Sequence, residues 1–233
     1  GKFITDIRPH GRGPGEWLGI TDFTVDETDR EIIVTADRPY KFLYYDYNGN
    51  FLREKTSEAF YTEITRTTDN ILAINSKVLE PKHYLSLLNE EDHRITVAKK
   101  IPLAFTYRGE FRCRGSYLLK SEHLYFTQNG DYTIYSWDNN RIKPVVTVDF
   151  GKYSYNPTQL NEEPHAPATR NKVLSIINVK EIRSNLFFNT NKIGLFVYNK
   201  TRHQIVHAYG ITNTNLGIVL HNSIATEDTH NEI

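Results

Sequence analysis

The strongest constraint on the fold is a repeat of β-rich units. The segment 1–4 (GKFI) matches the segment 49–52 (GNFL) at a separation of 48 residues, a length typical of propeller blades. Four short apolar runs lie near 20–25, 31–36, 41–46 and 50–55. Asn48-Gly49 separates the last two runs, and this dipeptide is a strong hairpin signal because both residues tolerate positive φ. Four short antiparallel strands per unit are the pattern of a propeller blade.

Three further units repeat this pattern, at about 60–101, 111–150 and 173–208. Residues 1–7 and 209–233 are expected to be partial blades, and 151–172 is expected to be a loop insertion because it is polar and rich in proline. No window keeps helical apolar spacing for three turns. The sequence therefore predicts an all-β fold, a six-bladed β-propeller of four-stranded antiparallel blades, forming a single domain over residues 1–233.

Composition limits the classes of partner. Lys plus Arg equals Asp plus Glu at 28 each, which argues against a general nucleic-acid binder and against a polybasic membrane surface. No run of about 18 apolar residues is present, so no membrane span is predicted. The lone Cys113 excludes an internal disulfide and a cysteine-based zinc site. The chain also lacks Met. We expect that residues are missing before Gly1, after Ile233 or at positions where methionines were omitted.

The glycine-rich stretch 11–17 (GRGPGEW) lacks the Gly-Lys-Ser/Thr ending of a phosphate-binding loop, and no helix is predicted after it. Its glycines suit a sharp crossing that needs positive φ, which Pro14 would stiffen. Glu16 is expected to accept hydrogen bonds from loop amides and Trp17 to pack between units. These considerations predict a structural role for Gly11, Gly13, Pro14, Gly15, Glu16 and Trp17.

The same stretch carries a family likeness. Segment 1–4, the loop 11–17 and the run 23–26 (FTVD) together resemble the bacterial six-bladed β-propeller family related to NHL repeats. The segment 131–135 (DYTIY), followed by 148–153 (VDFGKY), is similar to a second hallmark of that family. The resemblance implies a periplasmic or cell-surface protein, often a lipoprotein, of gut anaerobes. Most members have no assigned activity.

Catalytic and metal motifs are weak in this sequence. None of the nine histidines has a metal-binding spacing. Ser175 and Ser184 lack a Gly-x-Ser-x-Gly setting. The adjacent acids Glu90-Glu91 would point to opposite faces of a strand, so they form a poor glycosidase pair. We predict no catalytic residue, metal ligand or cofactor, although carboxylates from different units could still converge.

The predicted topology places the loops between second and third strands, and those between units, on one face. Arginine and tyrosine are frequent in these loops. Guanidinium groups bind carboxylate, sulfate or phosphate in a bidentate manner, and tyrosine stacks on sugars. The predicted ligand-binding residues are Arg38, Tyr40, Arg112, Arg114, Arg12 and Tyr107.

These residues predict a non-catalytic extracytoplasmic binding module for a glycan, a peptide or a partner protein. Two alternatives stay open at this point. One is a metal-dependent hydrolase or lyase with a site on the axial channel, which would need converging acidic or histidine side chains. The other is a structural scaffold.

Overall fold

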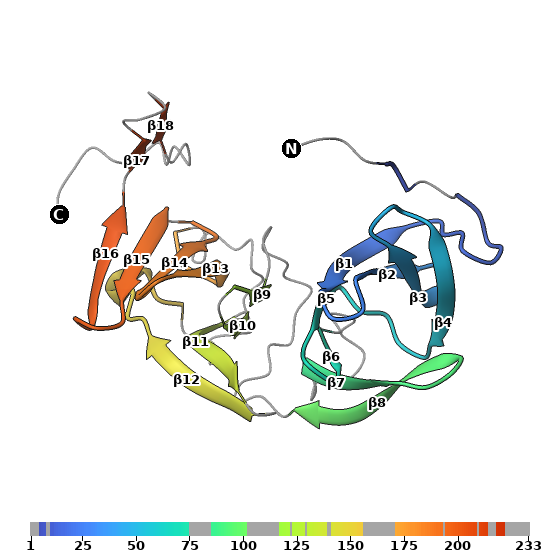
Figure 1. The fold of residues 1–233 in the computed structure, drawn as a ribbon. Helices are drawn as coiled ribbons and strands as arrows, with labels where there is room; N and C mark the ends of the chain where they lie inside the picture. Colours follow the sequence, from blue (N-terminus) through green and yellow to red (C-terminus); the bar gives the residue numbers. More distant parts are fainter. Residues whose placement is uncertain are drawn as a thin grey trace. The chain divides into compact units, whose positions relative to one another are not determined.

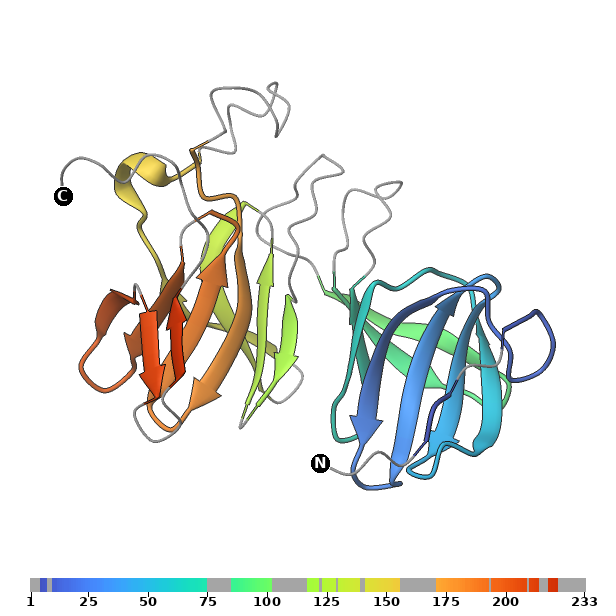
Figure 2. The ribbon, with the colours of Figure 1, turned by 90° about the horizontal axis from the view of Figure 1, so that it is seen from above.

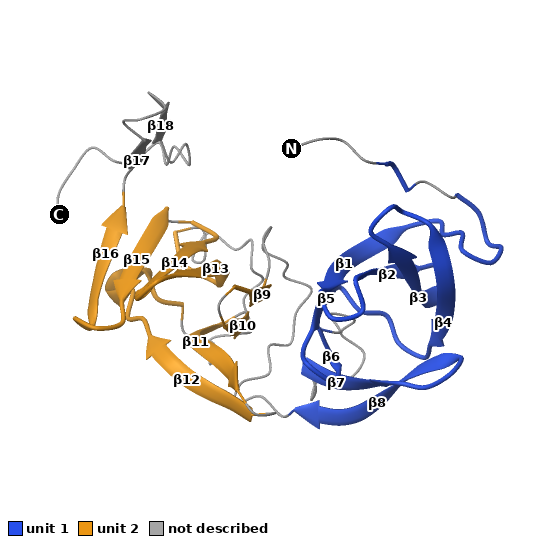
Figure 3. Ribbon diagram, in the orientation of Figure 1, with its two compact units in different colours: residues 1–109 blue, residues 110–233 orange. Residues whose placement is uncertain are grey.

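A computed structural model gives the fold of the chain (Figure 1). It describes residues 5–7, 10–74, 85–101, 117–121, 123–128, 130–138, 141–155, 171–192 and 194–208, and the backbone of 210–213 and 218–221. The predicted all-β class is confirmed, with one 3₁₀ turn, η1 (Gly151–Tyr153), among the described residues. The chain divides into two compact units, residues 1–109 and residues 110–233 (Figure 3). Within the described ranges, no helix has the length and apolar character needed to cross a membrane.

Unit 1 is one eight-stranded sheet in the order β1-β2-β3-β4-β8-β7-β6-β5. Figures 1 and 2 show β1–β4 and β5–β8 on opposite sides of its interior. Hairpin pairing is antiparallel throughout, as expected for strands joined by short turns. The strands are β1 (Ile20–Asp26), β2 (Glu31–Asp37), β3 (Tyr40–Asp46), β4 (Phe51–Ser57), β5 (Glu63–Arg66), β6 (Ile71–Ile74), β7 (Leu85–Glu90) and β8 (Arg94–Ile101).

The prediction of a six-bladed propeller made of four-stranded blades is wrong. β4 and β8 pair in parallel through Thr56 with Arg94 and Ser57 with Ile95. This pairing joins the first two predicted units into one sheet of eight strands. The physical reason is that alternation and turn residues specify hairpins between neighbours in sequence, but they do not specify which strands from different hairpins share an edge.

The two edges of this sheet meet along a seam, which nearly closes it. The backbone N–H of Ile64 on β5 donates to Asp22 Oδ2 on β1 at 2.8 Å. The N–H of Arg66 donates to Thr24 Oγ1 at 3.0 Å. Side chains of β1 thus satisfy amides that a neighbouring strand would otherwise satisfy. Burial raises the pKa of the Asp22 carboxyl, and the hydrogen bond from Ile64 opposes this shift only in part.

The interior of unit 1 is packed by apolar side chains from both halves of the sheet, β1–β4 and β5–β8. Ile33, Phe42 and Tyr44 come from β2 and β3, and Ile71 and Leu88 come from β6 and β7. Phe42, Tyr44, Ile71 and Leu88 are each no more than 1% exposed. The opposite face of β2 and β3 forms a second cluster of Trp17, Val34, Ala36, Leu43 and Tyr45. Unit 1 therefore has apolar clusters on both faces of β2 and β3.

Unit 2 contains two four-stranded sheets, β12-β11-β10-β9 and β13-β14-β15-β16, and the separate pair β17-β18. Its core includes Tyr125, Ile134, Phe150, Ile176 and Phe188. These residues come from both sheets and from the segment before η1, so the two sheets share one core. The strands are β9 (Leu118–Lys120), β10 (Leu124–Gln128), β11 (Asp131–Asp138), β12 (Arg141–Thr147), β13 (Ile176–Ile182), β14 (Asn185–Thr190), β15 (Leu195–Asn199), β16 (Gln204–Ala208), β17 (Gly210–Asn213) and β18 (Ile218–His221).

β1–β4 form at the four predicted runs of the first unit, and four strands form within each of the three further units. The chemistry of the turn at Asn48-Gly49 is also as expected. Asp46 Oδ1 accepts the amides of Asn48 and Asn50 at 2.9 and 2.8 Å, and Gly49 has φ +85°. Asn199 Oδ1 accepts the amides of the two residues that follow Lys200, at 3.1 and 2.8 Å. The assignment of residues 1–233 to a single domain stays a prediction.

The ends of the predicted insertion 151–172 are held together. The Tyr132 hydroxyl donates to the carbonyl of Val173 and accepts the amide of Tyr155. The amide of Val173 donates to the carbonyl of Tyr153 at 2.8 Å. Tyr132, which packs against the core of unit 2, therefore anchors both ends of the connection, while residues 156–170 lie outside the described residues.

Candidate functional site

The turn between β2 and β3 carries two of the predicted ligand-binding residues. The Arg38 side chain is 72% exposed, and its Nε lies 3.3 Å from Oδ2 of Asp37. The ring of Tyr40 faces that of Phe60, with centroids 5.8 Å apart and planes at 55°. The turn therefore presents a guanidinium to solvent and holds a tyrosine against a second aromatic ring. We call Asp37, Arg38, Tyr40 and Phe60 the β2–β3 surface.

Contacts beneath the β2–β3 surface fix the turn. The amide of Asp37 donates to the carbonyl of Gly19 at 3.1 Å. A Cβ at Gly19 would lie 2.5 Å from Asp37 Oδ1, so a larger residue there would require the Asp37 carboxylate to shift. Within the described part of the chain, Asp37 Oδ1 is buried without a hydrogen-bond partner. One carboxylate oxygen thus points inward while the other pairs with Arg38.

Of the other predicted ligand-binding residues, the structure describes Arg12 alone. Arg12 is exposed in the glycine-rich loop. Tyr107, Arg112 and Arg114 lie outside the described residues. Their participation in a site stays a prediction.

The glycine-rich loop 11–17 is bound by the chain's own carboxylates. Glu16 Oε2 accepts the amide of Gly13 at 2.8 Å, and Glu54 Oε2 accepts the amide of Gly15 at 2.8 Å. Lys41, only 3% exposed, donates to the carbonyl of Gly13 at 3.0 Å and to Glu54 at 2.8 Å. Burial opposes ionisation of Glu54, but the bonds from Lys41 and Gly15 outweigh it, so its pKa lies below the ordinary value. These loop amides therefore bind carboxylates of the chain itself.

Steric contacts explain the glycines and the tryptophan of this loop. Gly15 has φ +73°, and a Cβ there would lie 3.2 Å from the ring of Phe51. A Cβ at Gly11 would lie 2.0 Å from the Glu16 carboxylate. Trp17 is buried and packs edge-on against Tyr45, with centroids 6.1 Å apart. We interpret the loop as a structural element that covers the outer face of β2 and β3.

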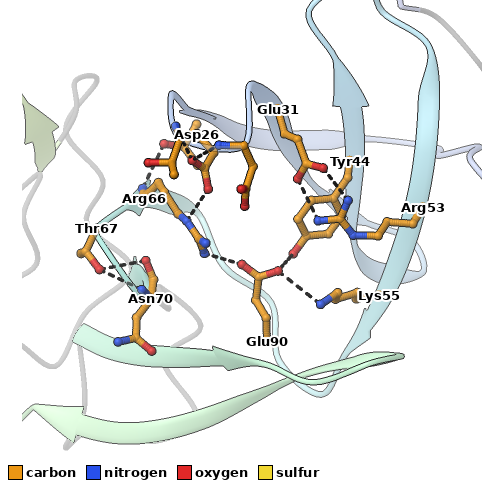
Figure 4. Close-up of polar contacts among 12 residues, drawn as sticks. Asp26, Glu31, Tyr44, Arg53, Lys55, Arg66, Thr67, Asn70 and Glu90 are labelled. Carbon is orange, nitrogen blue, oxygen red and sulfur yellow. Dashed lines mark hydrogen bonds and ion pairs between the residues drawn. The ribbon is translucent and has the colours of Figure 1, made fainter.

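A charged network occupies the interior of unit 1 (Figure 4). Arg66 forms ion pairs with Asp26, at 2.6 Å, and with Glu90. Glu90 Oε2 also accepts the Tyr44 hydroxyl at 2.7 Å and lies 3.3 Å from Lys55 Nζ. Glu90, on β7, is the centre of this network because it contacts side chains from β3, β4 and the end of β5.

A second pair extends this network toward solvent. Arg53 donates in a bidentate manner to Glu31 at 2.6 and 2.8 Å, and its Cζ lies 4.1 Å from the centroid of the Tyr44 ring. Three carboxylates, Asp26, Glu31 and Glu90, face three cations, Arg53, Lys55 and Arg66. The charges balance, so the network is suited to stabilising the fold.

Protonation states in the network follow from burial and charge. Burial raises the pKa of the Tyr44 hydroxyl, and the adjacent Glu90 carboxylate raises it further. Burial also opposes ionisation of Glu90, but the Tyr44 hydroxyl and the charges of Arg66 and Lys55 outweigh it and lower its pKa. Tyr44 is therefore a hydrogen-bond donor and Glu90 an anion at neutral pH.

Unit 2 contains a buried carboxylate that sequence reasoning missed. The Glu181 side chain is 1% exposed, and its Oε2 lies 2.6 Å from His123 Nδ1 and accepts the Tyr125 hydroxyl at 2.9 Å. Lys200 Nζ pairs with Oε1. The signal in the sequence was an acid inside the apolar run 176–182 (IINVKEI). Because a buried charge needs partners, such an acid indicates basic or hydroxyl groups nearby.

The His123 ring is the exposed member of this group, with 61% of its side chain in solvent. A carboxylate that fixes one imidazole nitrogen orients the other, as in many metal and general-base sites. The described residues contain no group of three or more His, Cys, Asp or Glu that could hold a metal ion. Among the described residues, the hydrogen bond of the His123 ring is to the Glu181 carboxylate.

The contacts define an all-β protein built from two units, each with its own core. The chain belongs to the family described as "Domain of unknown function (DUF4934)", whose model matches residues 1–232. Comparison with curated proteins gives no match. The NHL-related family that the sequence resembles is not shown by these comparisons.

Two solved structures are similar in fold. One is a "putative exported protein" from Bacteroides fragilis NCTC 9343, with a TM-score of 0.65 and 18% identity over 87% of this chain. The other is BamB from Moraxella catarrhalis, with a TM-score of 0.52 and 12% identity over 80% of this chain. The chain spans 61% of the first protein's length and 51% of the second's.

Proposed function

We propose that this chain is a non-catalytic binding module and that the β2–β3 surface takes part in recognising an anionic or sugar-containing ligand. The observation that carries the proposal is the contrast between arginines. Arg66 is only 15% exposed and pairs with two carboxylates, whereas Arg38 is 72% exposed, pairs with Asp37 through Nε alone, and lies on a fixed turn beside the Tyr40–Phe60 pair. Such a turn offers charge and an aromatic surface together.

The chemistry of the β2–β3 surface fits a ligand with a carboxylate, a sulfate or a phosphate. A guanidinium has five N–H donors in a planar fork, and the contact with Asp37 uses Nε. An aromatic ring beside the fork provides a face for a sugar or a planar group. A glycan, a peptide or a partner protein can carry these groups. Arg12, Tyr107, Arg112 and Arg114 are further candidates from the sequence.

We also propose that the module acts outside the cytoplasm, in the periplasm or at the cell surface. The similar fold of the Bacteroides fragilis "putative exported protein" supports this location, as does the resemblance of the loop 11–17 to secreted proteins. Protease treatment of intact cells and of separated periplasm, followed by detection of the native protein, tests the location. Recovery in the cytoplasmic fraction alone would contradict it.

The binding proposal is tested with an array of neutral, sulfated and uronic-acid glycans and with acidic peptides. Arg38→Ala is expected to weaken binding about tenfold, which corresponds to about 1.4 kcal/mol. Arg94→Ala is the matched control, because Arg94 is also exposed (59%) and paired with a neighbouring acid, Glu91. Equal binding by the wild type and Arg38→Ala, or equal loss in both variants, would show that the β2–β3 surface is not the site.

A further inference from the structure

Hairpin turns from both sheets of unit 2 meet at one end of the unit. Glu181 Oε2, on β13, lies 2.6 Å from Nδ1 of His123, in the turn before β10, and Oε1 pairs with Lys200, in the turn after β15. The amide of Lys200 donates to the carbonyl of Ser184, in the turn after β13, at 2.8 Å. The start of β10 also pairs with the end of β11, which pairs with the start of β12. The β9–β10, β13–β14 and β15–β16 turns and the adjoining ends of β11 and β12 therefore lie together.

Positive charge is in excess at this end. The chain as a whole has a formal net charge of zero. The segments that meet here contain six lysines and arginines but only three acids, within residues 120–123, 138–143, 181–184 and 199–203. A concentration of one sign of charge on a neutral chain creates a local field that attracts anions.

Within the described residues, ion pairing leaves four of these cations available. Glu181 is buried and pairs with Lys200, and Asp138 pairs with Lys143. The third acid, Glu122, lies outside the described residues. Four exposed side chains form no ion pair with another described residue, and we call them the cationic end of unit 2: Lys120, Arg141, Arg183 and Arg202.

The backbone at Arg183 gives its side chain particular weight. Arg183 has φ +57°, a left-handed conformation that glycine and asparagine adopt at lower cost. Arg30, in the turn after β1, has φ +56°, but its guanidinium lies over the Tyr47 ring, 5.6 Å from the centroid. The Arg183 guanidinium has no such partner among the described residues. An arginine at a strained turn position without an internal contact is a candidate for contact with a ligand.

The residues around the cationic end favour one class of ligand. Ile182, 49% exposed, is the only exposed large apolar side chain in the described part of these segments, whereas protein partners and membranes are bound through apolar surface. The segments contain no phenylalanine, tyrosine or tryptophan on which a nucleobase would stack. A linear acidic polysaccharide carries carboxylate or sulfate groups at intervals along a polar chain. It can therefore be bound by guanidinium and ammonium groups without an apolar or aromatic contact.

We propose that the cationic end of unit 2 binds an acidic polysaccharide. Its carboxylate or sulfate groups pair with Arg183 and Arg202, and Lys120 and Arg141 extend the charged surface along the polysaccharide. Because these cations come from separate hairpins, a chain with several charges pairs with more of them than a single small anion does. The proposal goes beyond the β2–β3 surface, because it concerns the other unit and a different set of residues.

The test measures binding of polygalacturonate and of dextran sulfate by calorimetry, with neutral dextran as the reference. Every protein carries Arg38→Ala, so that the β2–β3 surface does not contribute. Binding of at least one acidic polysaccharide is expected, and added salt should weaken it because salt screens exposed charges.

The decisive variant combines Arg183→Asn with Arg202→Gln, since asparagine suits the backbone at position 183. It is expected to bind about tenfold more weakly or worse, because two charge-assisted donors are removed. The matched control combines Arg30→Asn with Arg94→Gln. It also removes two arginines, one of them from a turn position with nearly the same φ, but from unit 1. The control should bind like the parent protein.

Four results would overturn the proposal. The Arg38→Ala protein could bind neither acidic polysaccharide, even where the wild type does, which would place the ligand at the β2–β3 surface. The two double variants could bind equally well. Phosphatidylglycerol vesicles, or a poly(dT) strand, could bind more tightly than both polysaccharides and depend on Arg183 and Arg202, which would assign the surface to a membrane or to a nucleic acid. Thermal melting checks that the decisive variant folds, and Lys120→Gln with Arg141→Gln replaces it otherwise.

Discussion

At the scale of single residues, Glu90 connects more of unit 1 than any other side chain in Figure 4. It binds Arg66, Tyr44 and Lys55, and its side chain is only 17% exposed. These contacts replace the hydration that the carboxylate loses on burial. Removal of its charge leaves two buried cations with fewer anionic partners, which costs more than the pair itself contributes.

Glu90→Gln is therefore expected to destabilise the chain by about 3 kcal/mol at pH 7. The neighbouring Glu91→Gln is the control, because Glu91 is exposed and pairs only with surface groups. Denaturant unfolding at several pH values measures both. The pKa of Glu90 is lowered from its ordinary value of 4.5, so its stabilisation is present above pH 4.5 and disappears as pH falls through the lowered value. Equal stability of the two variants at pH 7 would contradict this assignment.

At the scale of elements, the seam between β1 and β5 depends on the unusual pattern of β1. Its inward side chains, Asp22, Thr24 and Asp26, are polar, and its outward side chains Phe23 and Val25 are exposed. Alternation in β1 is therefore opposite to that of an ordinary half-buried strand. The inward polar groups are needed because β1 and β5 do not pair through a ladder of backbone hydrogen bonds. Amides of β5 donate instead to side chains of β1.

Asp22→Asn tests the cost of a buried carboxyl in the seam. The pKa of Asp22 is raised by burial, so its ionised form opposes folding above that pKa, and the penalty disappears as pH falls toward 3.8. An amide oxygen can still accept the Ile64 N–H. We expect a higher melting temperature for the variant at pH 7 and a gain that shrinks on acidification. Asp29→Asn, in the exposed turn after β1, should show no such trend. A lower melting temperature of Asp22→Asn at pH 7 would show that the charged hydrogen bond outweighs desolvation.

Strand positions were predictable from the sequence because they depend on local alternation and turn residues. Asn48-Gly49 forms a turn of the expected kind. Sheet organisation was not predictable in the same way. The parallel contact of Thr56 with Arg94 joins β4 and β8, and in sequence each of these strands resembles the last strand of its own unit. The alternation of apolar and polar residues along a strand does not specify this contact.

The candidate site was predictable only in part. Arg38 and Tyr40 are prominent because Pro39 lies between them in a turn, and the structure places them beside Asp37 and Phe60. Phe60 was not expected, because it comes from the connection before β5. Glu181 was also missed, since an acid in a strand is usually exposed and its partner His123 is 58 positions away. Tertiary pairing of polar groups leaves little trace in a single sequence.

At the scale of the whole molecule, unit 1 contains every contact that its sheet uses among the described residues. Its strands β1–β8, the seam, the charged network and both apolar clusters come from residues 1–109. A sheet whose edges meet leaves few unpaired backbone groups, and two apolar clusters on its faces provide the burial that a domain of this size needs. Unit 1 thus has the properties of an independent folding unit.

We therefore expect the fragment 1–109 to fold alone, with a cooperative thermal transition and the β-sheet circular dichroism of the whole chain. The fragment 1–57, which keeps β1–β4, is the control and should not fold. It lacks Ile71 and Leu88, which cover Phe42 and Tyr44, and it lacks Glu90, which pairs with Lys55. A large exposed apolar face would oppose its folding. A non-cooperative transition of fragment 1–109 would show that unit 1 depends on residues 110–233, and cooperative folding of fragment 1–57 would show that the seam and the network are dispensable.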